Sequence, residues 1–177
     1  MRVFLSLLVV SYLFALNPNK MNLIELYKRH YYTYICVNRW KFIKKYKDED
    51  LLSLVAASCV KKHMITPGID VAKVLRFTKI GRNNANYLST LFLIKHYIIS
   101  YIKDGFDLKN VNLPLIKGDL IGKIFILLKA QKPKVKDNSF VVVDGSLEYK
   151  VVVNLKRNLL YVYILNNGNL IKKDRYW

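Results

Sequence analysis

Apolar residues between Met21 and Lys47 recur at helical spacing among basic residues. The segment contains neither Pro nor Gly, so it predicts one or two amphipathic helices, which we call the basic arm. The apolar positions that carry this pattern are Leu23, Leu26, Tyr27, Ile35, Trp40 and Ile43. Two interpretations of the arm stay open. Its rings and bases contact a partner, or the rings are core and the lysines form a solvated face.

Three further helices are predicted between residues 48 and 105. The acidic run at residues 48–50 stands directly before the apolar stretch LLSLVAASCV. Carboxylates are favoured at a helix N-terminus, so we interpret this run as a cap rather than a metal site. Two breaks follow, at Thr66-Pro67-Gly68 and at Lys79-Ile80-Gly81. The helical patterns after these breaks lie in residues 69–78 and 82–93.

The spacing changes from helical to alternating near residue 120. Five short runs rich in β-branched and aromatic residues follow: KIFILLKA, SFVVVDG, LEYKVVVNL, NLLYVYIL and NLIKKDRYW. Asp144-Gly145 and Asn167-Gly168 are hairpin turn signals, so we expect an antiparallel β-meander from about Lys123 to the C-terminus. So small a sheet needs a cover on its apolar side, from the helices or from a second copy of the chain in a homodimer. The predicted fold class is α+β.

Charge and composition favour binding over catalysis. The 177 residues carry 30 Lys and Arg against 12 Asp and Glu, a formal charge of +18, and 53% of them are hydrophobic. Such a charge points to nucleic acid or an anionic membrane surface as the partner. Three His and few acids supply little for a metal site or an acid/base pair, so we expect no enzyme, no cofactor and no metal.

The cysteines and the N-terminal stretch bear on the compartment. Cys36 and Cys59 show no CxxC spacing, so we expect core thiols in a reducing compartment, and hence a cytoplasmic protein. Residues 3–16 are almost entirely apolar and have the form of a signal-peptide core, although they are short for a membrane span. The alternatives for residues 1–20 are a signal, an anchor, a buried helix, or an extension upstream of a start at Met21. The alternative function is therefore an exported, secreted or membrane-associated basic protein.

Residues 70–100 combine closely packing positions with a polar helix face. Val71, Ala72 and Leu75 place a small residue between apolar ones, and Gly81 opens the next helix. On that helix an apolar face carries Ala85, Leu88 and Leu91, and the polar face carries Arg82, Asn83, Asn84, Asn86, Tyr87 and Thr90. This pattern resembles the winged helix-turn-helix family of DNA-binding domains over residues 48 to about 105.

The resemblance implies a recognition helix at 82–93 that reads the major groove of double-stranded DNA. It also implies that LIKHYIIS, residues 93–100, passes into a first wing strand and that Lys103-Asp104-Gly105 is a wing tip. Asn can pair with adenine and Arg with guanine through two hydrogen bonds each, which suits this helix to reading bases. The alternative is that Asn83 or Asn84 is only a helix cap.

The predicted function is a DNA-binding protein, most simply a transcriptional regulator. The recognition helix reads bases, while phosphates are contacted by basic residues of the arm and the wing tip, namely Arg39, Lys41, Lys44, Lys45 and Lys103. The predicted regions are an apolar leader at 1–20, the basic arm at 21–47, a winged helix-like domain at 48–115 and a sheet domain at 116–177.

One catalytic pattern is present in the predicted sheet. Asp144, Glu148 and Lys150 resemble the Asp and Glu-x-Lys set of the PD-(D/E)xK metal-dependent nucleases, in which the acids hold Mg²⁺. Here Asp144 lies only four residues before Glu148, in a Gly-containing turn, and a charged hairpin explains the same residues. A Mg²⁺-dependent nuclease is thus the second alternative.

Overall fold

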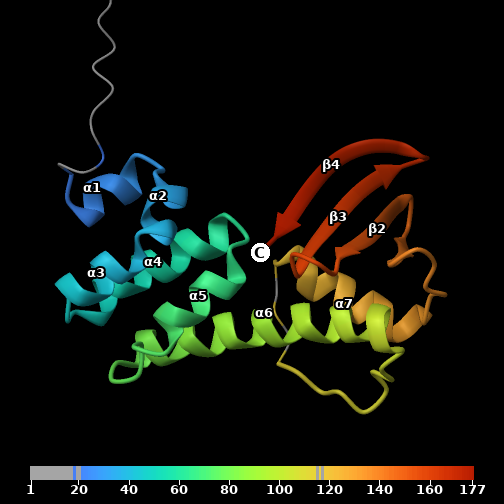
Figure 1. The fold of residues 1–177 in the computed structure, drawn as a ribbon, viewed down its shortest axis with the longest axis horizontal. Coiled ribbons are helices and arrows are strands. Elements are labelled where there is room, and N and C mark those ends of the chain that lie inside the picture. The colour runs from blue at the N-terminus through green and yellow to red at the C-terminus, as the bar shows by residue number, and fades with distance from the viewer. Residues whose placement is uncertain (1–17, 19–20, 115, 117) are drawn as a thin grey trace, which may run out of the picture.

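The structure is a computed structural model that describes residues 18, 21–114, 116 and 118–177. The apolar stretch 3–16 lies outside the described residues. Figure 1 shows a helical half on the left and a sheet half on the right, joined by one long helix. The described chain is α+β, as expected, with seven helices ahead of a four-stranded antiparallel sheet. The helices are α1 (Leu23–Lys28), α2 (Tyr32–Val37), α3 (Arg39–Lys45), α4 (Glu49–Lys61), α5 (Ile65–Ala72), α6 (Lys79–Asp104) and α7 (Leu120–Gln131).

The basic arm forms three short helices instead of the expected one or two. His30 has a positive φ of 62° between α1 and α2, and Asn38 ends α2 while also preceding α3. The apolar side of the arm is core, since Leu26, Ile35 and Phe42 are buried against α4 to α6. The arm's lysines remain exposed, which agrees with a core side and a solvated basic face, and contact of the arm with a partner stays a prediction.

The predicted break at residues 79–81 is wrong, because these residues open α6, and the one at residues 66–68 is wrong, because these residues form the first turn of α5. A proline there costs no intrahelical hydrogen bond, since the first N–H groups of a helix have no partner in it. Gly68 has a packing role as well. A Cβ at this position would lie 2.7 Å from Leu88 Cδ2, so glycine permits the close approach of α5 to α6.

Helix α6 runs without interruption for 26 residues, from the N-cap Thr78 to Gly105, which ends it in the left-handed conformation. The expected wing strand at 93–100 and wing tip at 103–105 are therefore wrong. The physical reason is the spacing of Leu91, Ile94, Ile98 and Ile102, which are all buried on one helical face. With no Gly or Pro between residues 82 and 104, nothing interrupts the helix.

The run KIFILLKA belongs to helix α7 and not to the expected first strand. Asp119 caps this helix, and its side chain accepts a hydrogen bond from the Ile121 backbone N–H at 3.0 Å. Ile121, Ile124 and Leu128 are fully buried, and their separations of three and four residues are helical. A short continuous apolar run does not distinguish a buried helix from a strand, which explains the error.

The remaining runs form the predicted meander, with strand order β1-β2-β3-β4. The strands are β1 (Ser139–Asp144), β2 (Leu147–Asn154), β3 (Leu159–Asn166) and β4 (Asn169–Tyr176). Both hairpin signals are confirmed. Gly145 turns β1 into β2 with φ 61°, and Asn167 and Gly168 turn β3 into β4 with φ 49° and 78°.

One face of the sheet is covered and the other is open. Helices α6 and α7 cover the inner face, where Phe140, Val142, Val151 and Val162 are buried in one apolar cluster. The part of the chain that the structure describes thus supplies the cover for the apolar side. Figure 1 shows both helices beneath the sheet and no helix above it. The outer face carries a mixture of tyrosines, valines and bases.

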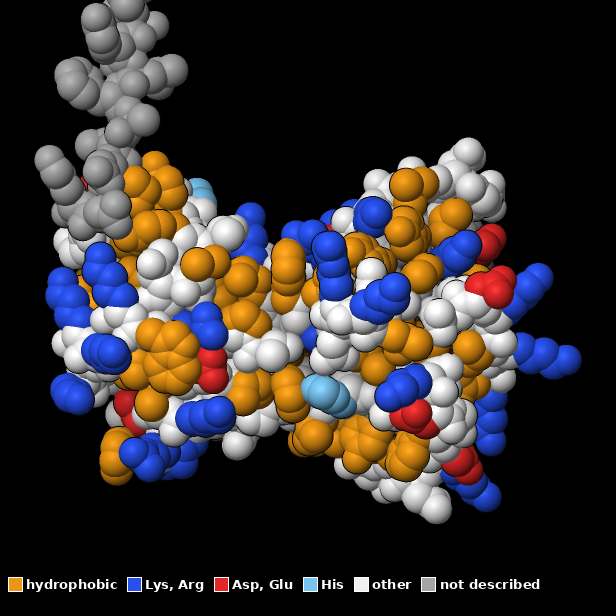
Figure 2. Space-filling view, viewed as in Figure 1, with side chains coloured by type: hydrophobic (Ala, Val, Ile, Leu, Met, Phe, Trp, Pro, Cys, Tyr) orange, Lys and Arg blue, Asp and Glu red, His pale blue; other side chains and the backbone are white. Residues whose placement is uncertain are grey.

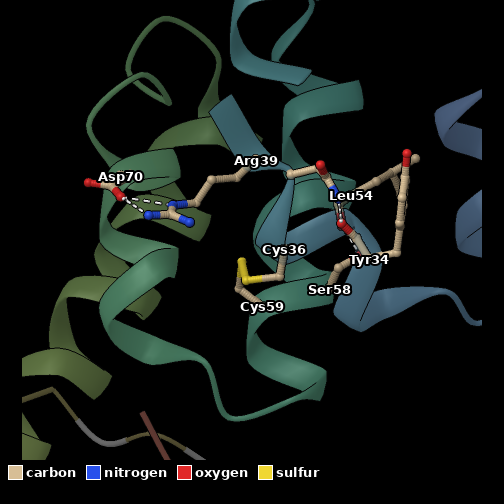
Figure 3. Close-up of a disulfide and its surroundings, with 8 residues drawn as sticks. Tyr34, Cys36, Arg39, Leu54, Ser58, Cys59 and Asp70 are labelled. Atoms are coloured by element: carbon tan, nitrogen blue, oxygen red, sulfur yellow. Dashed lines mark hydrogen bonds and ion pairs between the residues drawn. A yellow bond between two sulfur atoms is a disulfide. The ribbon is translucent and has the colours of Figure 1, made fainter. Parts of the chain in front are cut away.

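The two cysteines form a disulfide between α2 and α4, which corrects the expectation of free core thiols (Figure 3). Both residues are fully buried. No local spacing indicates the pairing, because Cys36 and Cys59 are 23 residues apart and meet only after α2 packs on α4. The disulfide also removes the argument for a reducing compartment.

The end of β4 connects the two halves. The Trp177 N–H donates to the His63 carbonyl at 2.9 Å, and the Thr66 N–H donates to the Trp177 carbonyl at 3.1 Å. Beneath this contact Lys95 of α6 is fully buried, and its Nζ donates to the Thr66 hydroxyl at 3.2 Å. Burial lowers the pKa of Lys95 to about 8.

Among the described residues, no helix is both long and apolar enough to cross a bilayer.

Candidate nucleic-acid interface

The turn between α5 and α6 is built around one buried carboxylate. Glu49, at the start of α4, accepts hydrogen bonds from the backbone N–H groups of Arg76, Phe77 and Thr78 at 2.6–2.7 Å. The Thr78 hydroxyl donates to the same carboxylate at 2.7 Å and also caps α6 by accepting from the Gly81 N–H. These bonds hold the turn in one shape.

The electrostatics of Glu49 follow from this geometry. The hydrogen bonds from the turn, led by the Phe77 N–H, lower the pKa of Glu49 to about 2 although burial opposes the shift. Glycine at residue 81 leaves space for the carboxylate, because a Cβ there would overlap it. The acidic run at 48–50 is therefore structural, as expected: Asp48 caps α4 by accepting from the Asp50 N–H, and Glu49 ties α4 to the turn.

The fixed turn exposes apolar and basic side chains together. The side chain of Phe77 is 77% exposed and that of Ile80 is 57% exposed, with the Arg76 guanidinium 5.3 Å from the centre of the Phe77 ring. Arg76 and Lys79 are exposed as well. These residues were not among the predicted DNA contacts, although the run RFTKIGR alternates bases with apolar residues and could have indicated them.

The expected recognition helix presents only part of its expected face. Arg82 is exposed, but its Nη1 donates to the Phe77 carbonyl at 2.7 Å and so helps to close the turn. Asn83 and Asn86 are exposed to solvent, and Asn84 lines a groove against α4. Ala85, Leu88 and Leu91 face inward as expected, with Ala85 only partly buried.

Tyr87 and Thr90 do not lie on an open surface. The Thr90 hydroxyl donates to the Asn86 carbonyl at 2.8 Å, and the residue is only 7% exposed. Tyr87 is half-buried; burial and the neighbouring Asp119 raise its pKa to about 12. The physical reason is that α6 packs on both cores, so a wide part of its circumference is covered.

The arm brings its bases to the same end of the molecule. Arg39 forms an ion pair with Asp70 of α5 at 2.7 Å, which fastens α3 to α5 (Figure 3). Lys41, Lys44 and Lys45 are exposed on α3. Figure 1 places α3 and the α5–α6 turn at the same end of the helical half. We call this surface the helical end: Trp40, Lys41, Lys44 and Lys45 of α3 with Arg76, Phe77, Lys79, Ile80 and Arg82.

Three acids near the helical end have partners within the fold. Asp70 pairs with Arg39 and lies 3.7 Å from the Lys73 Nζ, while Glu49 and Asp48 bond to backbone N–H groups. Among the described residues, none of the exposed lysines of α3 forms an ion pair with an acid. Figure 2 shows Lys and Arg side chains around apolar patches over this half of the molecule.

Lys103, the expected wing-tip base, is not part of this surface. It lies 21 residues after Arg82 on the same helix, which is about 30 Å away at 1.5 Å per residue. The structure thus brings together the arm bases and Arg82, and it separates Lys103 from them.

The structure does not bring the three nuclease-like residues together. Asp144 is paired with Leu147 and forms an ion pair with Lys123 of α7, so it points toward the inner side of the sheet. Glu148 and Lys150 lie on the outer face, because side chains alternate along β2. In the described part of the chain, no three His, Cys, Asp or Glu side chains are grouped as a metal site requires.

Comparison with known proteins found no matching family model, no matching curated protein and no matching solved structure. The geometry and charge of the described residues are therefore the basis on which a function is proposed.

Proposed function

We propose that this protein binds nucleic acid, and that its helical end contacts the phosphate backbone of double-stranded DNA. The observation that carries the proposal is the convergence of exposed bases from α3 and from the α5–α6 turn. The exposed lysines of α3 form no ion pair among the described residues, so they are available to phosphates. Contacts of this kind position a protein on DNA without reading its sequence.

Helix α6 exposes fewer side chains that could contact bases than the resemblance to the winged helix-turn-helix family implied. Of the amides on the expected reading face, Asn83 and Asn86 are exposed in the first turns of α6. We propose that any base-specific contact comes from these two. Among the described residues, the next element after α6 is helix α7 and not a strand, so a winged reading mode is not part of the proposal.

The test is a salt series of DNA binding with a matched control. Lys44→Ala with Lys45→Ala should weaken binding to any duplex and reduce the slope of log K against log salt by about 1.8, or 0.9 for each lost phosphate contact. Lys134→Ala with Lys136→Ala removes the same charge from an exposed loop of the sheet half and should leave the slope unchanged. Equal effects of the two pairs would show that net charge alone drives binding.

The second candidate is docking on an anionic membrane, and the exposed Phe77 and Ile80 favour it. Apolar side chains at the tip of a turn, with bases around them, suit insertion at the boundary between headgroups and acyl chains. Phe77→Ala with Ile80→Ala should then abolish co-sedimentation with vesicles that contain phosphatidylglycerol. The same variant should keep its affinity for duplex DNA if the first proposal is correct.

We also propose an oxidising compartment in place of the cytoplasm. A disulfide is uncommon in cytosolic proteins, where glutathione and thioredoxin keep thiols reduced. The pairing agrees with the exported alternative raised by residues 3–16. Alkylation of the protein in its native source, without reductant, tests this proposal, because both cysteines should be protected.

A further inference from the structure

The outer face of the sheet carries an ordered row of aromatic rings and cations. The strand register places Lys150, Tyr163 and Lys173 side by side, and in the next row Val152, Tyr161 and Arg175. Side chains in one row share a face of an antiparallel sheet. Tyr161 and Tyr163 are half-buried, while Lys150, Lys173 and Arg175 are exposed.

The rings and cations of this face contact one another. The Lys173 Nζ lies 5.2 Å from the ring centre of Tyr161 and 4.9 Å from that of Tyr163. The Arg175 guanidinium lies 3.9 Å from the ring centre of Trp177, which is 38% exposed. From β3 to the C-terminus, aromatic side chains therefore alternate with positive charges. Glu148 is the one acid on the outer face of β2.

We infer that this face binds single-stranded nucleic acid, with bases stacking on the rings and phosphates near the cations. The inference deepens the proposed function and depends on it for the class of ligand. Tyrosines two residues apart on a strand are about 7 Å apart, so each ring can receive one of two successive unstacked bases. A positively charged surface with stacking rings is the usual means by which proteins bind single strands without sequence preference.

Charge argues against other occupants. A second copy of the chain would place three bases opposite three bases, and like charges across an interface are unfavourable. A lipid surface would require one continuous apolar patch, whereas the charged Glu148 and Lys150 of β2 lie between Val141 and Val143 of β1 and Leu170 of β4. A polyanionic strand satisfies both the cations and the rings.

The two tryptophans provide separate reporters for the two proposed surfaces. The chain has only Trp40, on α3, and Trp177, beside Arg175. In Trp40→Phe, a fifteen-nucleotide oligothymidine should quench the fluorescence of Trp177. In Trp177→Phe, duplex DNA should change the fluorescence of Trp40 at the helical end. Each variant is the control for the other.

The decisive variants keep the sheet and remove the rings. Tyr161→Val with Tyr163→Val retains β-forming side chains and should weaken oligothymidine binding at least 10-fold in fluorescence anisotropy. Tyr161→Phe with Tyr163→Phe keeps the rings and should bind as the original chain does. Circular dichroism and a thermal melt would establish that both variants fold.

An abasic oligomer of the same length should bind at least 10-fold more weakly than oligothymidine, because it offers no bases to stack. Equal affinity for the two oligomers would overturn the inference, and so would oligothymidine binding that is unaffected by the valine variant. Loss of heparin binding by the valine variant, with its oligothymidine binding intact, would also overturn the inference. Loss of duplex binding in Lys44→Ala with Lys45→Ala concerns the helical end alone, so the two proposals can fail separately.

Discussion

The helical half and the sheet half are held together by different means. In the sheet half, four strands share continuous backbone ladders, and α6 and α7 pack on one face. In the helical half, three helices have only six or seven residues, a length at which isolated helices are marginal. Cross-links between elements compensate there: the Cys36–Cys59 disulfide, the Arg39–Asp70 ion pair and the buried Glu49. A few covalent and polar links therefore add to the apolar core of the helical half, whereas strand ladders and helix packing stabilise the sheet half.

The largest expected effect is a cavity in the sheet core. Phe140 is 2% exposed, and its ring meets that of Tyr101 edge to face at 6.0 Å between centres. Phe140→Ala should reduce the free energy of unfolding by about 3–5 kcal/mol. Denaturant unfolding measures this loss, and hydrogen exchange should locate it in β1 to β3. Equal loss of protection in α1 to α3 would show that the halves unfold as one unit.

Removal of the disulfide should have the next largest effect, and in the opposite half. Cys36→Ser with Cys59→Ser opens a loop of 23 residues and should cost about 2–4 kcal/mol. Hydrogen exchange should increase in α1 to α4 while the strands stay protected. Reduction of the original chain by dithiothreitol, with the sheet variant as reference, should reproduce the pattern. Protection that is unchanged in α2 would contradict the importance of this cross-link.

Lys95, which is buried where the two halves meet, should destabilise the folded protein. Lys95→Met should raise the free energy of unfolding at pH 7 by about 2 kcal/mol, because it removes a buried charge that has no acidic partner within ion-pairing distance among the described residues. The folded pKa near 8 lies below the ordinary 10.5, so the unfolded chain binds more protons between these values and stability rises with pH across that window. Unfolding curves at pH 7, 8 and 10 should show that Lys95→Met loses this rise.

The smallest effect concerns the cross-link through Glu49. Its pKa is lowered from 4.5 to about 2, so its contribution to stability is complete above pH 5 and is lost as the pH falls toward 2. Glu49→Gln should be less stable at pH 6 and should lose this acid dependence. Asp48→Asn is the matched control, since it removes one charge from the same helix end but keeps an N-cap. Identical thermal melts for both variants would contradict the role of Glu49.

Sequence patterns predicted the elements whose local signals agree with their packing. The meander followed from alternation and two hairpin turns, and the apolar face of α4 followed its acidic cap. The secondary-structure predictions were wrong where tertiary packing, and not residue composition, decided between helix and strand. The isoleucines of residues 94–102 are β-branched, yet their helical spacing between two cores makes them part of α6. Residues 123–130 are apolar on most sides because α7 is deeply packed, and such a run has no clear period.

The candidate surfaces also divide into features that local sequence patterns predict and features that depend on tertiary packing. The basic residues of the arm could be named from sequence because exposure of lysine is the rule. The disulfide, the burial of Thr90 and the opposite faces of Asp144 and Glu148 depend on three-dimensional pairing that no local pattern encodes. Alternation along residues 159–166 places Tyr161 and Tyr163 on one face of the strand. This face is uncovered because α7 packs on the opposite face, and the sequence pattern did not predict α7 as a helix.

The continuous helix α6 fixes the two halves of the molecule relative to each other. Its 26 residues extend about 39 Å, and the helix is packed into the core of each half, so the two proposed surfaces sit a fixed distance apart. A ligand that joins a duplex to a single-stranded tail should therefore gain affinity only when its duplex is long enough to let it contact both surfaces. Affinity plotted against duplex length should rise in a step at that length.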